Sequence, residues 1–388
     1  MKKKTQTPWD FLDAWRGTMF TGEWPTLPEM FKISVDRFAE RPCFTVFEPD
    51  RVTLTYGETL EKVETLAAWM YEQGIRKGDH IAFSGKNSPE WAVVFLATLF
   101  AGAIVVPIDY ALHDHEIDNL LKAAEPKMFF VDDERYELFS AKKKIGKVFS
   151  LSPKHEKKYV YSLRAKKEHK IIPPEENDVA AIMFTSGTTG TPKGVVLTHR
   201  NFVSDCYIAQ SNLSIYETDV FYALLPIHHS YTMQAVLIEG LSVCAEIVFG
   251  KSLAISRMMR ELRDGKITML LGVPLLFNKL LAGILRGIRE KGILVYGAIK
   301  VLMGFSYLTK KLTGKNPGKK IFHSILDKAS ISTLRIAISG GGPLAPSVFR
   351  MYNELGIDFI QGYGLTETSP IIALNPKDHF KVKSVGRY

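Results

Sequence analysis

With 388 residues, the chain is longer than one hydrophobic core usually supports, so we expect two or more core units. Its apolar content of 46% and charged content of 23% are ordinary for a soluble globular protein and argue against a disordered or fibrous chain. The formal net charge is +9, and residues 142–170 hold this excess, with eleven Lys and Arg against Glu156 and Glu168.

The basic segment 142–170 has two open interpretations. A solvated surface loop is the favoured one, because charge runs usually face water. The other is contact with anionic lipid or with the phosphates of a CoA-like ligand. Its few aromatic residues show no stacking pattern, so no nucleic-acid partner is expected.

The N-terminal residues and the cysteines indicate the cellular compartment of the protein. Basic residues follow Met1 without an apolar stretch, so we expect no secretory signal. Cys43, Cys206 and Cys244 lack CxxC spacing, which fits a reducing compartment and argues against a structural metal site. We therefore expect a cytoplasmic protein, with membrane association at the inner face as the alternative raised by its basic segments.

The first part of the chain predicts alternating helices and strands. Residues 28–40 form a predicted helix capped by Thr26, followed by a hairpin at 44–56 and a helix at 57–73. Strands at 80–83, 104–107 and 128–131 then alternate with helices at 88–100 and 113–124. Alternation of this kind predicts a parallel, doubly wound sheet, whose ligands bind beyond the carboxyl ends of the strands.

A glycine- and threonine-rich loop follows a predicted strand at 179–184. Its glycines can adopt φ > 0, its hydroxyls can donate, and a lysine ends it, which together suit a polyphosphate. It is no Walker loop, because the lysine precedes Gly194 and a strand-like 195–197. A plain hairpin is the competing interpretation. The candidate ligand-binding residues are Thr185, Ser186, Gly187, Thr188, Thr189, Gly190 and Lys193.

The second part predicts further strands at 221–225, 247–249, 267–271 and 334–338, with helices between them. Residues 293–308 are almost wholly apolar, but the run is short for a bilayer of ~30 Å and contains Lys300. Basic residues on both sides favour an interfacial helix on an anionic leaflet, and a helix packed on the second subdomain is equally compatible.

Three polar clusters in this part are candidate ligand-binding segments, and the first two follow predicted strands. His228 and His229 end the strand at 221–225, and Ser339-Gly340-Gly341-Gly342-Pro343-Leu344 ends the strand at 334–338. On its own, the glycine run indicates only a tight strand-to-helix turn. The third cluster is more informative, because it places an aromatic ring between glycines and before a hydroxyl and a carboxylate: Gln361, Gly362, Tyr363, Gly364, Leu365, Thr366 and Glu367.

Together the loop at 185–194 and the clusters at 339–344 and 361–370 resemble the signature motifs of the adenylate-forming superfamily, most closely the long-chain fatty acyl-CoA synthetases. The resemblance implies two stacked, doubly wound α/β subdomains. The predicted division is residues 1–177, with a basic linker at 142–177, and residues 178–380, which hold the nucleotide motifs. Residues 381–388 would begin a small barrel and C-terminal domain that the chain largely lacks.

The resemblance also implies residue roles. Gly340, Gly341, Gly342 and Pro343 would line the adenine and the acyl pocket, and Tyr363 would stack on adenine. Lys193, His229, Thr366 and Glu367 would be catalytic, with Glu367 and Thr185 holding Mg²⁺. His228 stands where many members have an aromatic residue, so which imidazole faces the site is left open.

The implied reaction is attack of a carboxylate on the α-phosphate of ATP, followed by transfer of the acyl group to CoA. ATP, Mg²⁺ and CoA are therefore the expected cofactors, and a fatty acid is the expected substrate. Because family residues for ribose and carboxylate lie in the absent part, the chain alone is expected to adenylate poorly. Two alternatives remain: a fatty acyl-AMP ligase that loads a carrier protein, and a non-catalytic nucleotide- or lipid-binding module.

Overall fold

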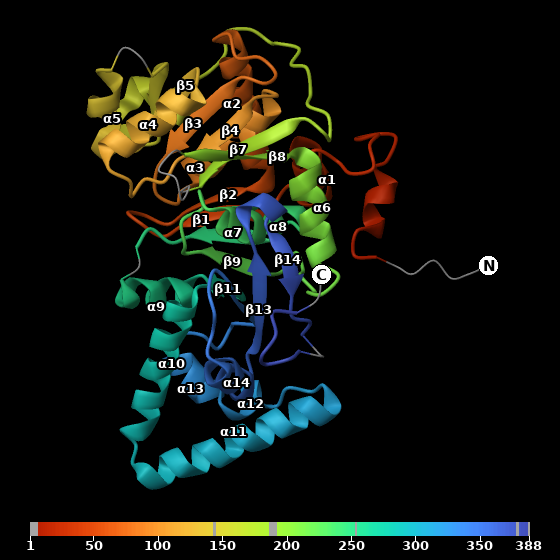
Figure 1. The fold of residues 1–388 in the computed structure, drawn as a ribbon, viewed down its shortest axis with the longest axis vertical. Coiled ribbons are helices and arrows are strands. Elements are labelled where there is room, and N and C mark those ends of the chain that lie inside the picture. The colour runs from red at the N-terminus through yellow and green to blue at the C-terminus, as the bar shows by residue number, and fades with distance from the viewer. Residues whose placement is uncertain (1–6, 143–144, 186–191, 253, 378–379, 387–388) are drawn as a thin grey trace, which may run out of the picture.

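The computed structural model describes residues 7–142, 145–185, 192–252, 254–377 and 380–386. Two largely parallel sheets make up the fold (Figure 1). The first has six strands, in the order β6 (Lys147–Ser150), β5 (Met128–Val131), β3 (His80–Ser84), β4 (Ile104–Pro107), β7 (Val179–Thr185) and β8 (Lys193–Thr198). Its first five strands are parallel, and β8 is antiparallel to β7.

The second sheet has eight strands. Their order is β14 (Ile371–Leu374), β13 (Asp358–Gly364), β12 (Ile336–Ser339), β11 (Met269–Gly272), β9 (Val220–Ala223), β10 (Glu246–Phe249), β1 (Pro42–Val46) and β2 (Val52–Thr55). The two edge strands are antiparallel to their neighbours, and all other pairs are parallel. The α/β fold class and the doubly wound sheets are therefore confirmed.

The helices form layers on both faces of each sheet. One outer layer covers the first sheet: α4 (Asp114–Ala124) and α5 (Asp133–Ser140). A middle layer packs between the sheets and shares one core with both: α1 (Leu27–Phe38), α2 (Tyr56–Glu72), α3 (Pro89–Phe100), α6 (His199–Ala209), the π-helix η4 (Met233–Ile238) and α8 (Glu239–Ser242). The other outer layer covers the second sheet: α9 (Ile255–Asp264), α10 (Pro274–Arg289), α11 (Ile293–Thr313), α13 (His323–Lys328) and α14 (Pro346–Leu355).

Short elements connect these layers. They are α7 (Ser230–Thr232), α12 (Gly318–Ile321), and the 3-10 helices η1 (Asp10–Ala14), η2 (Pro153–Lys158), η3 (Val160–Ser162) and η5 (Thr366–Thr368). Strand β5 shows why the layers form, because Phe129 packs on the outer helices while Met128 and Phe130 join the middle core. A strand buried on both faces needs apolar side chains at successive positions, as this one has.

Local signals in the sequence account for the helix starts. The Thr26 hydroxyl accepts from the Glu29 amide at 3.3 Å, and the Glu29 carboxylate accepts from the Thr26 amide in a capping box. Ser88 caps α3 in a similar way, by accepting from the Trp91 amide at 3.1 Å, with Pro89 in the first turn. The predicted cap at Thr26 is confirmed.

The sheets do not divide at residues 177 and 178, where the subdomain boundary was predicted. Strands β1 and β2 come from the first segment but join the second sheet, and β7 and β8 come from the second segment but join the first. The predicted boundary assigned strands to subdomains by their order in the sequence. It is wrong for β1, because β1 pairs with β10, some two hundred residues later in the chain. The two subdomains therefore exchange strands, and the cleft between them is built from both.

The predicted linker at 142–177 also differs from the structure. It contains β6, which pairs with β5, and it buries Phe149, Val160 and Leu163 in the core. Some of its lysines have acidic partners, since Lys154 Nζ lies 2.5 Å from Asp133 and Lys142 Nζ lies 2.5 Å from Asp118. Part of the segment's excess charge is thus neutralised locally.

Candidate active site

A cleft of about 650 Å³ opens where strands of both sheets end. Strands β4 and β7 of the first sheet lead into it, and so does the segment after β9 of the second. Parallel sheets place ligand sites beyond the carboxyl ends of their strands, and this cleft has that position. Residues far apart in the sequence meet there: Asp109, Thr185, Pro192, His228, His229 and Thr366.

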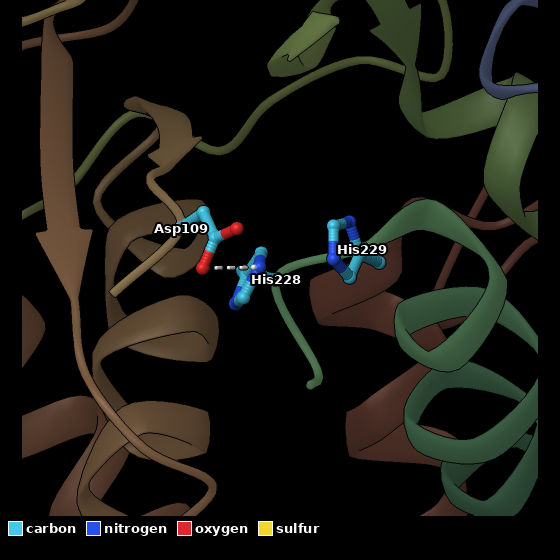
Figure 2. Close-up of side chains that lie close together, drawn as sticks. All are labelled: Asp109, His228 and His229. Atoms are coloured by element: carbon cyan, nitrogen blue, oxygen red, sulfur yellow. Dashed lines mark ion pairs between the residues drawn. The ribbon is translucent and has the colours of Figure 1, made fainter. Parts of the chain in front are cut away.

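Asp109 and His228 form a pair across this cleft (Figure 2). Asp109 follows β4, while His228 follows β9, and their side chains approach to 3.2 Å between Oδ1 and Nε2. The His228 ring is buried, and neither ring nitrogen makes an aligned hydrogen bond to another described residue. Contact with this imidazole lowers the pKa of Asp109 to about 2, so Asp109 is an anion at neutral pH.

His229 lies beside this pair, makes no ion pair with Asp109 among the described residues, and is exposed to the cleft. It precedes the short helix α7, and its ring centroid lies 4.2 Å from that of His228. Burial lowers the pKa of His229, and the neighbouring His228 lowers it further, whereas Asp109 raises it. A neutral imidazole at the cleft can donate or accept a hydrogen bond. Of the two histidines, His229 is therefore the exposed one, and His228 is held against Asp109.

Thr366 brings the third motif to the same place. It begins η5, directly after β13, and its hydroxyl lies 3.0 Å from the hydroxyl of Ser230. The next residue, Glu367, is exposed and makes no ion pair among the residues that the structure describes. Oxygen ligands suit Mg²⁺, so the exposed carboxylate of Glu367, next in the chain to the cleft-lining Thr366, is chemically suited to a metal bound to phosphate.

The predicted phosphate loop is described only at its two ends. Thr185 ends β7 and lines the cleft, and Lys193 pairs with it in the ladder at the start of β8. Lys193 is exposed and has no ion-pair partner in the described part of the chain. Ser186, Gly187, Thr188, Thr189 and Gly190 lie outside the described residues.

The fold itself explains why glycine is needed at two of the three positions that follow β12. A Cβ at Gly340 would lie 2.9 Å from the ring of Tyr231, whose hydroxyl donates to the Ile338 carbonyl at 3.1 Å. Gly341 has a φ of +70°, which favours glycine. Gly342 has more room, since a Cβ there would be 3.6 Å from Pro274. Pro343 is exposed beside it.

Close packing between strands also explains the glycines on either side of Tyr363. A Cβ at Gly364 would lie 1.8 Å from the Pro370 carbonyl, so the approach of β14 to β13 requires glycine there. Gly362 is less restricted, at 3.2 Å from Leu374. Gln361 is buried in register with Ser339, whereas the Tyr363 ring is 49% exposed and available for stacking.

Sequence reasoning missed Asp109 and Ser230. Asp109 follows the predicted strand at 104–107, so the rule that ligands bind beyond strand ends could have found it. Asp109, His228 and His229 each offer one ligand atom, and these atoms lie within 4.8 Å of one another. Such a group could hold a cation, although the close contact between Asp109 and His228 already pairs two of its members.

A second cavity, of about 430 Å³, lies between α9, α10 and α13. Most of its lining is apolar, including Leu224, Met258, Leu276, Ile284 and Ile331. The charged side chains on its lining are all basic: Lys279, Arg286, Lys291 and Lys328. Its volume lies within the range of about 300–1,000 Å³ that is usual for small-molecule pockets.

Comparison with known proteins identifies the family. The family model described as AMP-binding enzyme matches residues 31–388. The chain belongs to the AMP-binding enzyme family. Among the curated relatives is the peroxisomal long chain acyl-CoA synthetase 6 of Arabidopsis thaliana, 28% identical over 82% of this chain and 48% of the relative. A feruloyl-CoA synthase of Amycolatopsis sp is 25% identical over 94% of this chain and 63% of the relative.

Solved structures confirm the fold of this chain. The anthranilate CoA ligase AuaEII, solved in complex with anthranoyl-AMP, superimposes with a TM-score of 0.74 at 18% identity, over 94% of this chain and 64% of that chain. The chain therefore spans about half to two thirds of the length of the relatives it matches.

Proposed function

We propose that this chain is the large domain of an acid–CoA ligase, which uses ATP to convert a carboxylic acid to an acyl-adenylate and then to an acyl-CoA. The observation that supports it best is the meeting of Thr185, His229 and Thr366 at one cleft between the two sheets. These residues come from three separate motifs of the family, and nothing in the sequence order alone brings them together.

The first step joins two anions. A carboxylate oxygen attacks the α-phosphorus of ATP, the bond from that phosphorus to the bridging oxygen breaks, and pyrophosphate leaves. The site must therefore neutralise charge, because the nucleophile is already ionised. Lys193 supplies a positive charge to the leaving group, while the hydroxyl of Thr366 and the neutral ring of His229 orient the carboxylate and the phosphorus.

Mg²⁺ would neutralise part of the triphosphate charge when bound. Glu367 is the carboxylate proposed to hold it, because its side chain is exposed and it follows the cleft-lining Thr366 in the chain. Thr185, which lines the cleft, has a hydroxyl that can complete the ligand set. In the second step, the CoA thiol would attack the acyl carbon and release AMP.

We propose a long-chain fatty acid as the substrate. The support is the apolar cavity between α9, α10 and α13, together with the likeness to a long chain acyl-CoA synthetase. Leu224 and Leu225 line the cavity and lie four and three residues before His228 of the cleft, which supports a path from a chain bound there to the reacting atoms. The feruloyl-CoA synthase among the relatives makes an aromatic acid the competing substrate.

The test is formation of acyl-AMP from ATP with a panel of acids: hexadecanoate, butyrate, ferulate and anthranilate. We expect hexadecanoate to react fastest. The substitution Leu280→Trp should narrow the apolar cavity and slow hexadecanoate selectively, while butyrate is unaffected. Equal loss with both acids, or a preference for ferulate, would contradict the fatty-acid proposal.

Two further outcomes distinguish the alternatives. If acyl-AMP forms but only a carrier-protein thiol accepts the acyl group, the protein is a fatty acyl-AMP ligase. If the folded chain binds ATP but forms no acyl-AMP with any acid, even in a form extended past Tyr388, a non-catalytic binding module is favoured. Comparing CoA with a holo-carrier protein in the same assay separates the first case from the proposed ligase.

A further inference from the structure

Helix α11 turns an apolar face to solvent. Six apolar residues after the first position of the helix, each 44 to 86% exposed, form what we call the outer stripe: Leu294, Val301, Leu302, Phe305, Leu308 and Leu312. Their spacing of three, four or seven residues puts most of them on one side of the helix. A helix on the surface of a soluble domain normally shows the opposite arrangement, with its apolar face buried.

The inner face of α11 is fixed to the domain by polar as well as apolar contacts. The Lys310 ammonium is buried and donates to Asn353 at 2.5 Å and to Asp358 at 2.8 Å. Met303 and Ser306 are buried on the same side. Because these contacts hold the helix on α14, the outer stripe cannot turn inward without breaking a buried ion pair.

Among the described residues, α11 is the one helix long and apolar enough to cross a membrane, but its most apolar window is 17% buried. Crossing is incompatible with its setting. Its two ends connect to α10 and to the short helix α12, and one side rests on α14 (Figure 1). The helix lies across the end of the molecule opposite the first sheet, so its outer stripe is open along its whole length.

The charges around the outer stripe indicate what covers it. Residues 286–320 contain nine Lys and Arg and one acidic residue, Glu290. Lys291 precedes the helix, while Lys311 and Lys315 stand at its other end, and all three are exposed without an ion pair in the described part of the chain. A second copy of this face would bring like charges together, whereas an anionic membrane surface offers both lipid tails and negative headgroups.

We propose that α11 docks this protein on an anionic membrane surface, with the outer stripe in the boundary between headgroups and acyl chains and the helix parallel to the bilayer. Lys291, Lys311 and Lys315 contact the headgroups at its two ends. The inference does not depend on the reaction, because no residue of the cleft takes part in it.

The test is binding of the 388-residue chain to phosphatidylcholine vesicles with and without a minority of phosphatidylglycerol, measured by co-sedimentation. We expect binding to the anionic vesicles that weakens with salt. The triple change Val301→Gln, Phe305→Gln and Leu308→Gln should reduce partitioning by roughly a hundredfold, since each buried apolar side chain contributes to insertion. A matched control changes three exposed apolar residues elsewhere: Val52→Gln, Ile172→Gln and Ile208→Gln.

The charges are tested in the same assay. Changing Lys291, Lys311 and Lys315 to Gln should weaken binding to anionic vesicles by up to roughly a hundredfold and leave binding to neutral vesicles unchanged. The matched control removes three exposed lysines of the other basic segment: Lys157→Gln, Lys167→Gln and Lys170→Gln. Loss of binding in this control instead would assign the contact to segment 142–170 and overturn the proposal.

Two further measurements test how deeply α11 inserts into the bilayer and whether the protein associates with itself. In the variant Phe305→Trp, brominated lipids should quench the added fluorescence when vesicles are present. Sedimentation in the absence of lipid gives the oligomeric state. A dimer that the outer-stripe changes dissociate would show that a second copy covers the stripe. That result, absence of vesicle binding, or equal loss in the apolar control would each overturn the proposal.

Discussion

The cleft between the sheets and the outer helix α11 reverse the usual placement of polar and apolar side chains. At the cleft, Asp109 and His228 are drawn together from separate sheets, with His228 buried. At α11, leucines and a phenylalanine face solvent while Lys310 is buried beneath them. Both arrangements cost stability, since a buried polar group needs partners and an exposed apolar face gains nothing from folding.

The difference teaches where to look for each kind of function. The cleft depends on residue types that motifs specify, so its parts can be found one by one in the sequence. The function of α11 depends on which side of the helix is covered. Its sequence is apolar on most sides, and only the contacts with α14 show that the leucine-rich side is the free one.

The largest effect is expected from Lys193→Ala, which tests the cleft side of the comparison. Loss of one positioned charge donor should slow acyl-AMP formation by about 10²–10³-fold, a typical effect of removing such a group. Because the side chain is exposed, thermal stability should stay unchanged. The control is Lys122→Ala, an exposed lysine on α4 that does not line the cleft. Similar slowing in both variants would remove the special role given to Lys193.

The next effect concerns stability and the inner face of α11. Lys310→Met leaves Asp358 without its closest cation, so the free energy of unfolding should fall by roughly 3 kcal/mol. Lys311→Met, one residue along and exposed, should change it by less than about 0.5 kcal/mol. Urea unfolding measures both. Equal values would mean that α11 is not fixed by this pair, and its outer stripe would then be free to repack.

These two regions also show how far sequence reasoning reaches. The alternating strands and helices were predicted to within a few residues, because hydrophobic periodicity and caps such as Thr26 and Ser88 are local. The exchange of β1 and β7 between sheets was not predicted, because pairing between strands that are distant in the sequence, β1 with β10 and β7 with β4, leaves no local signal. The contact of Asp109 with His228 was missed for the same reason.

The layer between the sheets offers a third test, because it buries acids away from both regions. Burial raises the pKa of Glu239 to about 8 and that of Asp205 to about 7, so both carboxyl groups are mainly neutral in the folded state below about pH 6. The folded protein then binds more protons than the unfolded chain above pH 4.5, the ordinary pKa of Glu239. Stability should therefore fall as pH rises from about 5 to 8.

Glu239→Gln replaces one of these two titrating groups with a side chain that binds no proton over this pH range. Relative to the unchanged chain, the variant should lose roughly 3 kcal/mol less stability between pH 5 and pH 8, because each unit of pKa shift corresponds to about 1.4 kcal/mol and most of the shift from 4.5 to about 8 lies in this interval. Urea midpoints at the two pH values provide the measurement, with the exposed Glu156→Gln as the control. An unchanged pH dependence in the Glu239 variant would show that this carboxyl is ionised in the folded protein.

The smallest expected effect concerns the cleft. It tests whether the pair of Asp109 and His228 changes the pKa of the exposed His229. The negative charge of Asp109 raises the pKa of His229, against the lowering by burial and by His228. Asp109→Asn keeps the shape but removes that charge, so the pKa of His229 should fall further, as followed by NMR titration. The His228 ring also loses the anion that holds it, and we expect acyl-AMP formation to slow by roughly tenfold.

The control for this change is Asp264→Asn, an exposed carboxylate at the end of α9 and remote from the cleft. A purely structural pair would lower stability in the Asp109 variant without moving the titration of His229. If Asp109 acts through the histidines, the pKa and the rate change together while the KM for ATP stays the same, since neither Asp109 nor His228 is expected to contact the leaving pyrophosphate. Only this second pattern would show that Asp109 and His228 position His229 for the reaction at the cleft.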